Sequence, residues 1–189
     1  MKPLKITKRL SLVLLLAIGV VSCSKEALQN KEDLSVITVE LKTITNDFQN
    51  VFLDIENVEL RTKESNVMEN AWISLKSINS GTHNADHMQS DNGLILVEHC
   101  EVKAMTIYEI RLNLGNNNFI NINNTLIHLD VQNMGKPSAS NLMNTTLLKN
   151  NFYTFVININ IDESLSFDEN QNIMILNPKI YTEIRQVQY

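Results

Sequence analysis

Only two cysteines, Cys23 and Cys100, occur in the 189 residues. A framework of several disulfides, which stabilises many small exported domains, is therefore excluded, and the fold has to rely on an apolar core. Glycine and proline are also scarce, with five and three residues. Because asparagine tolerates the left-handed backbone of tight turns, the abundant asparagines between apolar runs are expected to replace glycine at several turns.

The chain also lacks the motifs of common catalytic sites. It has no Gly-x-Ser-x-Gly nucleophile elbow and no glycine-rich phosphate loop. Aromatic residues make up 6% of the chain, and the single tryptophan, Trp72, stands apart from the scattered tyrosines, so no sugar-stacking platform is indicated. We therefore expect a protein that is not an enzyme and that uses no cofactor.

The longest apolar run lies near the N-terminus, behind a basic segment. Four Lys and Arg residues in the first nine precede a mainly apolar run at residues 10–21, and Ser22 then leads directly to Cys23. A membrane-spanning helix needs about 20 apolar residues, so this shorter run predicts a cleaved signal. A small residue directly before a cysteine is typical of bacterial lipoprotein signals, in which the cysteine sulfur is acylated before cleavage. Residues 1–22 are thus predicted to be a lipoprotein signal peptide, the alternative being an ordinary secretory signal with an incidental cysteine.

Lipidation of Cys23 would anchor an otherwise soluble chain to a membrane. Each methylene buried in the bilayer contributes about 0.8 kcal/mol to membrane binding, and stable anchoring takes at least two acyl chains. A triacylated cysteine carrying palmitate meets that condition. Ser24 stands where an aspartate would retain a lipoprotein in the inner membrane, which favours the bacterial outer membrane. Whether the chain then faces the periplasm or the exterior is left open.

Removal of residues 1–22 makes the chain more acidic. Four of the 16 Lys and Arg residues are lost, which leaves 12 against 21 Asp and Glu, a formal charge of −9. An acidic surface repels phosphate backbones, so nucleic acid is not an expected partner. The expected partners are the membrane, through the lipid, and an unidentified envelope protein or glycan.

The mature sequence divides into a short tether and one domain. Residues 23–34 contain the lipidated cysteine and a polar segment without periodicity, which is typical of a flexible tether. Residues 35–189 are enough for one domain with its own core, and alternating apolar and polar residues predict many short strands in it. Such strands are expected at residues 37–41, 51–60, 72–75, 94–97, 106–114, 119–122, 126–131, 152–161, 173–176 and 179–184.

Breaks in the alternation predict the connections between these strands. The apolar parity changes near Glu56 and Asn57, which predicts a β-bulge. Residues 76–92 are polar and are expected to be a long loop, and residues 134–140 also break the pattern. With no amphipathic helix longer than two turns, the sequence predicts a single all-β antiparallel sandwich of about 7–9 strands.

The most distinctive segment reads Ile-Arg-Leu-Asn-Leu-Gly-Asn-Asn-Asn, at residues 110–118. Together with residues 51–60, 71–75, 153–164 and 176–180, it resembles a family of Bacteroidetes-type lipoprotein domains of unknown function. The resemblance implies an immunoglobulin-like or transthyretin-like β-sandwich without established catalytic activity. In this segment we expect Ile110 and Leu112 to face the core and Arg111 to pair with acidic neighbours on the outer face.

The chain departs from that family in two places. Residues 103–105 read Lys-Ala-Met where members usually carry Pro-Ala-Gly. Residues 158–160 read Asn-Ile-Asn where members often carry an ending like Asp-Phe-Asp. A role that needs paired carboxylates at the second place is therefore in doubt for this chain.

Candidate metal ligands gather in the polar segment at residues 83–91. His83, Asp86, His87 and Asp91 lie within nine residues, and the two histidines have the four-residue spacing that zinc ligands use on a helix. The segment has no helical period and lacks the usual glutamate beside the first histidine. A solvated loop is favoured over a metal site formed by His83, His87 and Asp91.

Two further patterns have a structural interpretation beside the chemical one. His99 adjoins Cys100, but neighbouring residues of a strand point to opposite faces, so a buried structural cysteine is favoured over an activated nucleophile. Residues 168–172 read Asp-x-Asn-x-Asn, the first half of a calcium loop. Ile173 and Lys179 stand where that loop needs its glycine and glutamate, so a hairpin turn is favoured.

The sequence leaves three functional hypotheses. The leading one is a non-enzymatic binding, adhesion or structural module presented at the cell envelope. The second is an accessory lipoprotein of an outer-membrane uptake or assembly complex, and the third is a metal-dependent hydrolase that uses residues 83–91. The place of Trp72 is open, because its replacement by alanine would cost about 3–5 kcal/mol in a core but below about 1 kcal/mol at an exposed contact.

Overall fold

Strand β1 (Leu34–Ile44) lies inside the smaller of two sheets. Its residues Ile37, Val39 and Leu41 point into the core and are fully buried, as their alternation predicts. The sheet has the order β13 (Lys179–Val187), β10 (Phe152–Asn160), β1 and β5 (Leu94–Lys103). Strands β1 and β10 are parallel, whereas β5 and β13 pair antiparallel with their neighbours. This computed structural model describes residues 33–89, 93–131 and 138–187.

The larger sheet is built around β2 (Val51–Arg61). Its main path runs β11 (Leu165–Asp168), β12 (Ile173–Leu176), β8 (Thr125–Val131), β7 (Phe119–Ile122), β2, β6 (Thr106–Leu114) and β9 (Ser138–Thr146). Strands β3 (Trp72–Leu75) and β4 (Gly81–Asn84) also pair with β2. Two short helices, η1 (Ala85–Met88) and α2 (Ile161–Ser164), connect strands. No helix in the described ranges has the length and apolar character needed to cross a bilayer.

The inward faces of the two sheets form one apolar core. Both sheets contribute fully buried side chains, among them Phe155, Ile157 and Ile159 from the smaller sheet and Leu53, Leu60, Ile110, Leu112 and Leu114 from the larger one. Burial of a large aliphatic or aromatic side chain contributes about 1.5–3 kcal/mol. The core therefore supplies stability to a domain in which Cys100 is the one cysteine among the described residues.

The all-β sandwich is confirmed, but its sheets are more extensive than predicted. The described residues form 13 strands where 7–9 were expected, and both sheets are mixed because β1 pairs in parallel with β10 and β12 with β8. The predicted long loop at residues 76–92 contains β4 and η1, which corrects that prediction. Strand β9 begins at Ser138, inside the segment expected to break the pattern.

The predicted bulge and the predicted use of asparagine are both confirmed. The register of β2 against β6 shifts between Ile55 and Asn57, so that Glu56 is the extra residue. Within the described ranges, eight residues other than glycine have a positive φ, and seven of them are asparagines: Asn50, Asn70, Asn123, Asn124, Asn144, Asn150 and Asn172. Consecutive left-handed residues at 123 and 124 form the two-residue turn between β7 and β8, as in type I′ hairpins.

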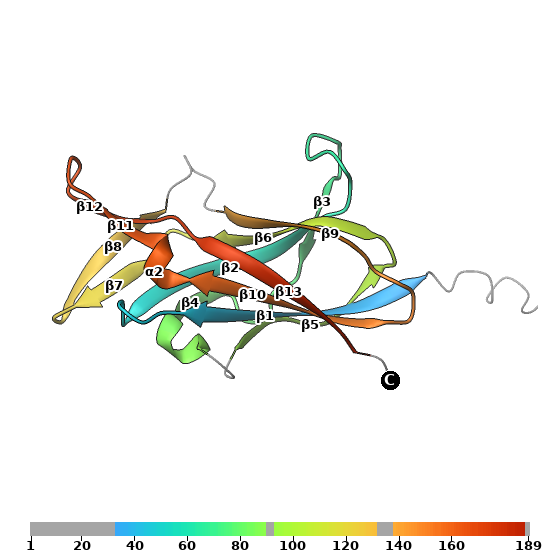
Figure 1. Cartoon of the computed structure of the whole chain (residues 1–189), viewed down its shortest axis with the longest axis horizontal. Coiled ribbons are helices and arrows are strands. Elements are labelled where there is room, and N and C mark those ends of the chain that lie inside the picture. The colour runs from blue at the N-terminus through green and yellow to red at the C-terminus, as the bar shows by residue number, and fades with distance from the viewer. Residues whose placement is uncertain (1–32, 90–92, 132–137, 188–189) are drawn as a thin grey trace, which may run out of the picture. The chain divides into compact units, whose positions relative to one another are not determined.

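The described chain starts at one end of the sandwich. The backbone oxygen of Asp33 accepts from the amide of Ala104 at 2.7 Å, and that of Leu34 accepts from Asn150 at 2.7 Å. The Asp33 carboxylate also lies 3.5 Å from the ammonium of Lys149. Strand β1 runs from this end toward α2, and Figure 1 shows β7, β8, β11 and β12 at the opposite end.

Candidate binding site

The structure places the predicted metal-binding residues on different elements. His83 lies on β4, where its Nε2 is 3.1 Å from the backbone oxygen of Asn79, whereas His87 is exposed on η1. The two histidines therefore do not share a helix face. Asp86 accepts the backbone amide of Asn50 at 2.9 Å. Asp91 lies outside the described residues, within which no three His, Cys, Asp or Glu side chains gather as a metal site.

Cys100 is half-buried at the margin of the core. Its neighbour His99 has a φ of 46° at an irregularity in the pairing of β5 with β1. Burial, and secondarily the charge of Glu101, raise the pKa of the Cys100 thiol above its usual value. A raised pKa keeps the thiol protonated at neutral pH, which disfavours a nucleophilic role.

The segment that copies half a calcium loop is the turn between β11 and β12. The Oδ1 atom of Asp168 accepts the backbone amides of Asn170 and Gln171, at 2.9 and 3.2 Å. Asn172 then adopts a φ of 56° and leads into β12. The predicted hairpin turn is confirmed, and its side-chain bonds explain the Asp-x-Asn-x-Asn pattern.

The asparagine-rich end of the distinctive segment joins three strands of the larger sheet. Asn118 is fully buried, its Oδ1 accepts the amide of Asp54 at 2.8 Å, and its Nδ2 donates to the oxygen of Gly115 at 2.7 Å. The backbone oxygen of Asn118 accepts from Leu129 on β8 at 2.9 Å. A Cβ on Gly115 would lie 2.2 Å from Asp54 Oδ2, so any other residue there would displace the Asp54 carboxylate. This part of the segment therefore has a structural role.

Arg111 fulfils the structural role predicted for it. Ile110 and Leu112 are fully buried, while the Nε atom of Arg111 lies 3.2 Å from Glu59 Oε2 on the outer face of the sheet. The guanidinium also stacks on the half-buried Trp72 ring. A second pair, Arg61 with Glu109 at 2.8 Å, lies beside it, so this face is occupied by cross-strand ion pairs.

Asp162 holds the loop after β1 against helix α2. Its carboxylate accepts the backbone amides of Asn46, Asp47 and Phe48 and a hydrogen bond from the Thr45 hydroxyl. Burial alone would raise the pKa of this carboxyl, but the hydrogen bonds outweigh burial and hold the pKa below its usual value. All of these donors belong to residues 45–48 of the same chain, so we assign a structural role to Asp162 and not a role in a binding site.

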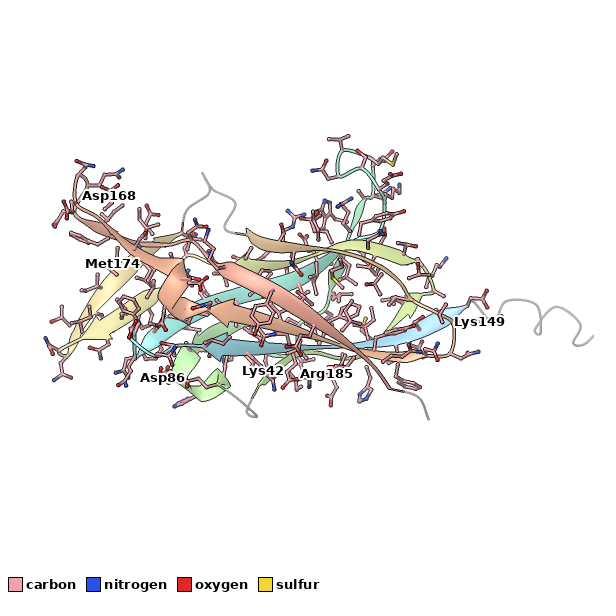
Figure 2. The ribbon with its side chains drawn as sticks, in the orientation of Figure 1. Lys42, Asp86, Lys149, Asp168, Met174 and Arg185 are labelled. Atoms are coloured by element: carbon pink, nitrogen blue, oxygen red, sulfur yellow. The ribbon has the colours of Figure 1, made fainter. Side chains whose placement is uncertain are left out.

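A pocket of about 580 Å³ lies where the β11–β12 hairpin meets β8. Its apolar lining consists of Ile127, Phe167, Ile173 and Met174. The volume falls within the range of about 300–1,000 Å³ usual for ligand sites. Met174 lines the pocket, and Figure 2 shows Met174 and Asp168 at the end of the sandwich opposite Lys149.

Polar groups complete the pocket lining at three positions. The Nε2 atom of His128 lies 2.9 Å from the backbone oxygen of Asn116, which holds the ring in place. Asp130 is exposed and forms no ion pair within the described part of the chain, and Asn172 closes the lining at the hairpin turn. The site offers an apolar surface with one carboxylate, an arrangement that suits ligand binding better than catalysis.

The sequence does not predict this pocket. Strand β11 was not predicted, since Leu-Ser-Phe-Asp is short, and its partner β12 pairs with β8 over a separation of about 45 residues in sequence. An exposed apolar residue on each of the two hairpins marks this region, but only the structure shows that exposure. Leu126 and Phe167 are 63% and 54% exposed although both lie in strands.

Comparisons with known proteins bear on the family and not on this pocket. A family model described as a domain of unknown function (DUF4382) matches residues 37–178. No curated protein sequence matches the chain significantly. A crystal structure of a fimbrial protein from Bacteroides vulgatus is similar over 78% of this chain and 54% of that one, with 10% identity and a TM-score of 0.36. The chain thus spans about half the length of that protein, and a likeness this distant carries no functional argument.

Proposed function

The chain belongs to the family of domains of unknown function DUF4382, and we propose that it is a lipid-anchored, non-enzymatic module that presents a binding pocket at the bacterial envelope. The anchor is the acylated Cys23, and residues 24–32 connect it to the sandwich. The bound partner is an envelope component, and the pocket is the one between β8 and the β11–β12 hairpin.

One observation carries the proposal: the described chain starts at one end of the sandwich and the pocket lies at the other. Asp33 is held beside Lys149 and Ala104, whereas Asp168 and Met174 mark the opposite end (Figure 2). At about 3.3 Å per residue, the 11 residues of β1 alone span about 35 Å between these ends. A domain tethered through Asp33 can therefore direct its pocket away from a membrane surface.

Three candidate catalytic side chains in the described part of the chain are unactivated or already engaged, which supports a binding role over catalysis. The raised pKa of Cys100 disfavours a thiolate, and His83 is engaged by the backbone of Asn79. The carboxylate of Asp162 is occupied by hydrogen bonds from its own chain. Turnover of a peptide, glycan or ester that is abolished by one side-chain substitution would contradict the proposal.

The anchor is tested by replacing Cys23. The full-length gene is expressed in a bacterium that processes lipoproteins and is fed radiolabelled palmitate. Wild type is expected to take up label and to sediment with membranes, whereas Cys23→Ala takes up none and is found in the soluble fraction or retains its leader. Cys100→Ala is the matched control and is expected to behave as wild type. Equal membrane association of the unlabelled Cys23→Ala protein, with its leader removed, would refute lipid anchoring.

The presentation of the pocket is tested in intact cells. Protease treatment of whole cells and of opened cells reports whether the domain faces the exterior or the periplasm. Crosslinking of intact envelopes, followed by purification of the chain, reports its partner. Recovery of a stable uptake or assembly complex would replace an independent binding role by an accessory one.

A further inference from the structure

The pocket lies where two hairpins of the larger sheet diverge. Strand β12 pairs in parallel with β8 only at Met174, Ile175 and Leu176, which face residues 129–131. The first half of β8, residues 125–128, pairs with β7 on one side. On the other side of residues 125–128, no strand of the described chain pairs with β8. Ile173 of β12 pairs with β11 but not with β8.

Unpaired flanks of this kind bind other strands. In an antiparallel pair, alternate residues direct their backbone N–H and C=O groups away from the partner strand. Residues 125–128 therefore present backbone donors and acceptors toward the gap, and an extended segment that adds there gains ladder hydrogen bonds. The pocket thus has the geometry of a slot between two strands of one sheet.

The side chains around the slot define what such a segment carries. Ile127, Phe167, Ile173 and Met174 line it with apolar surface, and Phe167 is 54% exposed. Leu126, the chain neighbour of Ile127 on β8, is 63% exposed. Exposed apolar residues that cluster mark interaction surfaces. They fit apolar side chains on one face of an extended ligand.

The charge at the slot is negative. Asp130 lines the pocket, and Asp168 and Glu169 lie at the turn of the β11–β12 hairpin. His128, the one basic side chain in the lining, is held by the backbone of Asn116. A group of negatively charged carboxylates favours a cationic partner, because the electrostatic potentials of the two surfaces are then complementary.

We propose that this slot binds an extended peptide segment in which basic and apolar residues alternate, by adding it as a strand beside β8. The inference deepens the proposed function and rests on it, since it names the partner of the presented pocket. A glycan is the less fitting occupant, because Phe167 is the one aromatic ring in the lining and the unpaired backbone would be left without a strand.

The test uses the full-length protein, purified in detergent, with fluorescent peptides as probes. The basic probe is Lys-Val-Lys-Val-Lys-Val-Lys, and its controls are the Glu-Val analogue and a backbone N-methylated copy. Binding of the basic probe is expected to weaken about tenfold or more on N-methylation, a loss of about 1.4 kcal/mol. The acidic analogue is expected to bind no better than the N-methylated copy.

Variants locate the binding. Asp130→Lys and Phe167→Ser are each expected to weaken the basic probe about tenfold. Glu98→Lys makes the same charge change on the exposed face of β5, and Tyr181→Ser removes an exposed ring from β13; both are expected to bind like wild type. Equal losses with Asp130→Lys and Glu98→Lys would mean that only net charge matters, which overturns the proposal.

Hydrogen exchange supplies the readout specific to strand addition. The basic probe is expected to protect backbone amides at residues 125–128 and to leave β13 unchanged. Binding without this protection, or binding of a chitin oligosaccharide in the same pocket, would overturn the proposal. Because these measurements are made in detergent solution, their failure is distinct from a failure of lipid anchoring, which the Cys23 variant reports.

Discussion

The guanidinium carbon of Arg111 lies 3.6 Å from the centre of the Trp72 ring. The two residues come from β6 and β3, which both pair with β2. Glu59 on β2 lies 3.2 Å from the Nε atom of the same arginine. The single tryptophan is therefore a half-buried support for an ion pair on the outer face, and not a member of the core.

Replacing Trp72 by alanine is expected to cost about 1–2 kcal/mol in the free energy of unfolding, because a desolvated cation–π contact and partial ring burial are lost. Urea denaturation measures the change. Leu112→Ala, which removes a fully buried side chain, is the core comparison and is expected to cost about 2–5 kcal/mol. A loss of about 3 kcal/mol or more for Trp72→Ala would show that the ring behaves as a core residue, which contradicts this assignment.

The same pair gives a double-mutant cycle. Trp72→Ala and Arg111→Met, made singly and together, are expected to show a coupling of about 0.5–1 kcal/mol. Additive effects would show that the stacking contributes nothing beyond packing.

Asn118 is expected to be the most sensitive asparagine of the chain's distinctive segment. Asn118→Ala leaves a half-buried amide of Asp54 and a buried carbonyl of Gly115 without these partners, which costs about 1–3 kcal/mol for each fully buried group. Thermal or urea unfolding measures it. Asn116→Ala changes an exposed side chain in the same turn and is expected to stay within about 0.5 kcal/mol. Equal effects at the two positions would contradict the structural role of Asn118.

Asp162 predicts an acid-sensitive contribution to stability. Its carboxyl pKa is lowered from the usual value of 3.8, so its stabilising effect is present above that value and is lost as the pH falls through the folded-state pKa. Asp162→Asn is expected to be less stable than wild type at neutral pH, with the difference shrinking toward about pH 2. Urea unfolding at a series of pH values measures this, and a difference that is constant with pH would exclude the ionised carboxylate as its cause.

The left-handed asparagines predict opposite outcomes for alanine and glycine. Asn150 is exposed with a φ of 59°. Asn150→Ala is expected to cost about 1–2 kcal/mol, because a Cβ without a compensating side chain is unfavourable in this conformation. Asn150→Gly is expected to stay within about 0.5 kcal/mol. Asn66→Ala, at an exposed asparagine without a positive φ, is the control, and an equal effect there would exclude the backbone explanation.

Local patterns predicted the strands that build the core. Residues such as Val39 in β1 and Leu112 in β6 are fully buried on one face of their strands, so apolar and polar residues alternate in the sequence of each strand. The bulge at Glu56 was predictable for the same reason, because an extra residue shifts the apolar parity. These features depend only on which face of a strand meets the core.

Strands held mainly by backbone pairing were not predictable in this way. Strand β4 reads Gly-Thr-His-Asn and β9 reads Ser-Ala-Ser-Asn-Leu-Met-Asn-Thr-Thr, with little apolar alternation. They are strands because β2 and β6 offer them a ladder. The pocket shares this origin, since it depends on where β8 and β12 stop pairing, and no local pattern encodes that position.

The parallel pairing of β1 with β10 has a consequence for how the chain reaches its native state. The first strand of the domain finds one of its two partners more than 100 residues later, as the bond from the Ser35 hydroxyl to the Leu148 carbonyl, over 113 residues, illustrates. Contacts this distant in sequence impose a large loop-closure entropy before they return any energy, so we expect folding in milliseconds to seconds and not microseconds. The smaller sheet cannot close until β10 has been synthesised and is free to pair. A chain of this topology therefore cannot complete its smaller sheet until nearly the whole domain is available to pair.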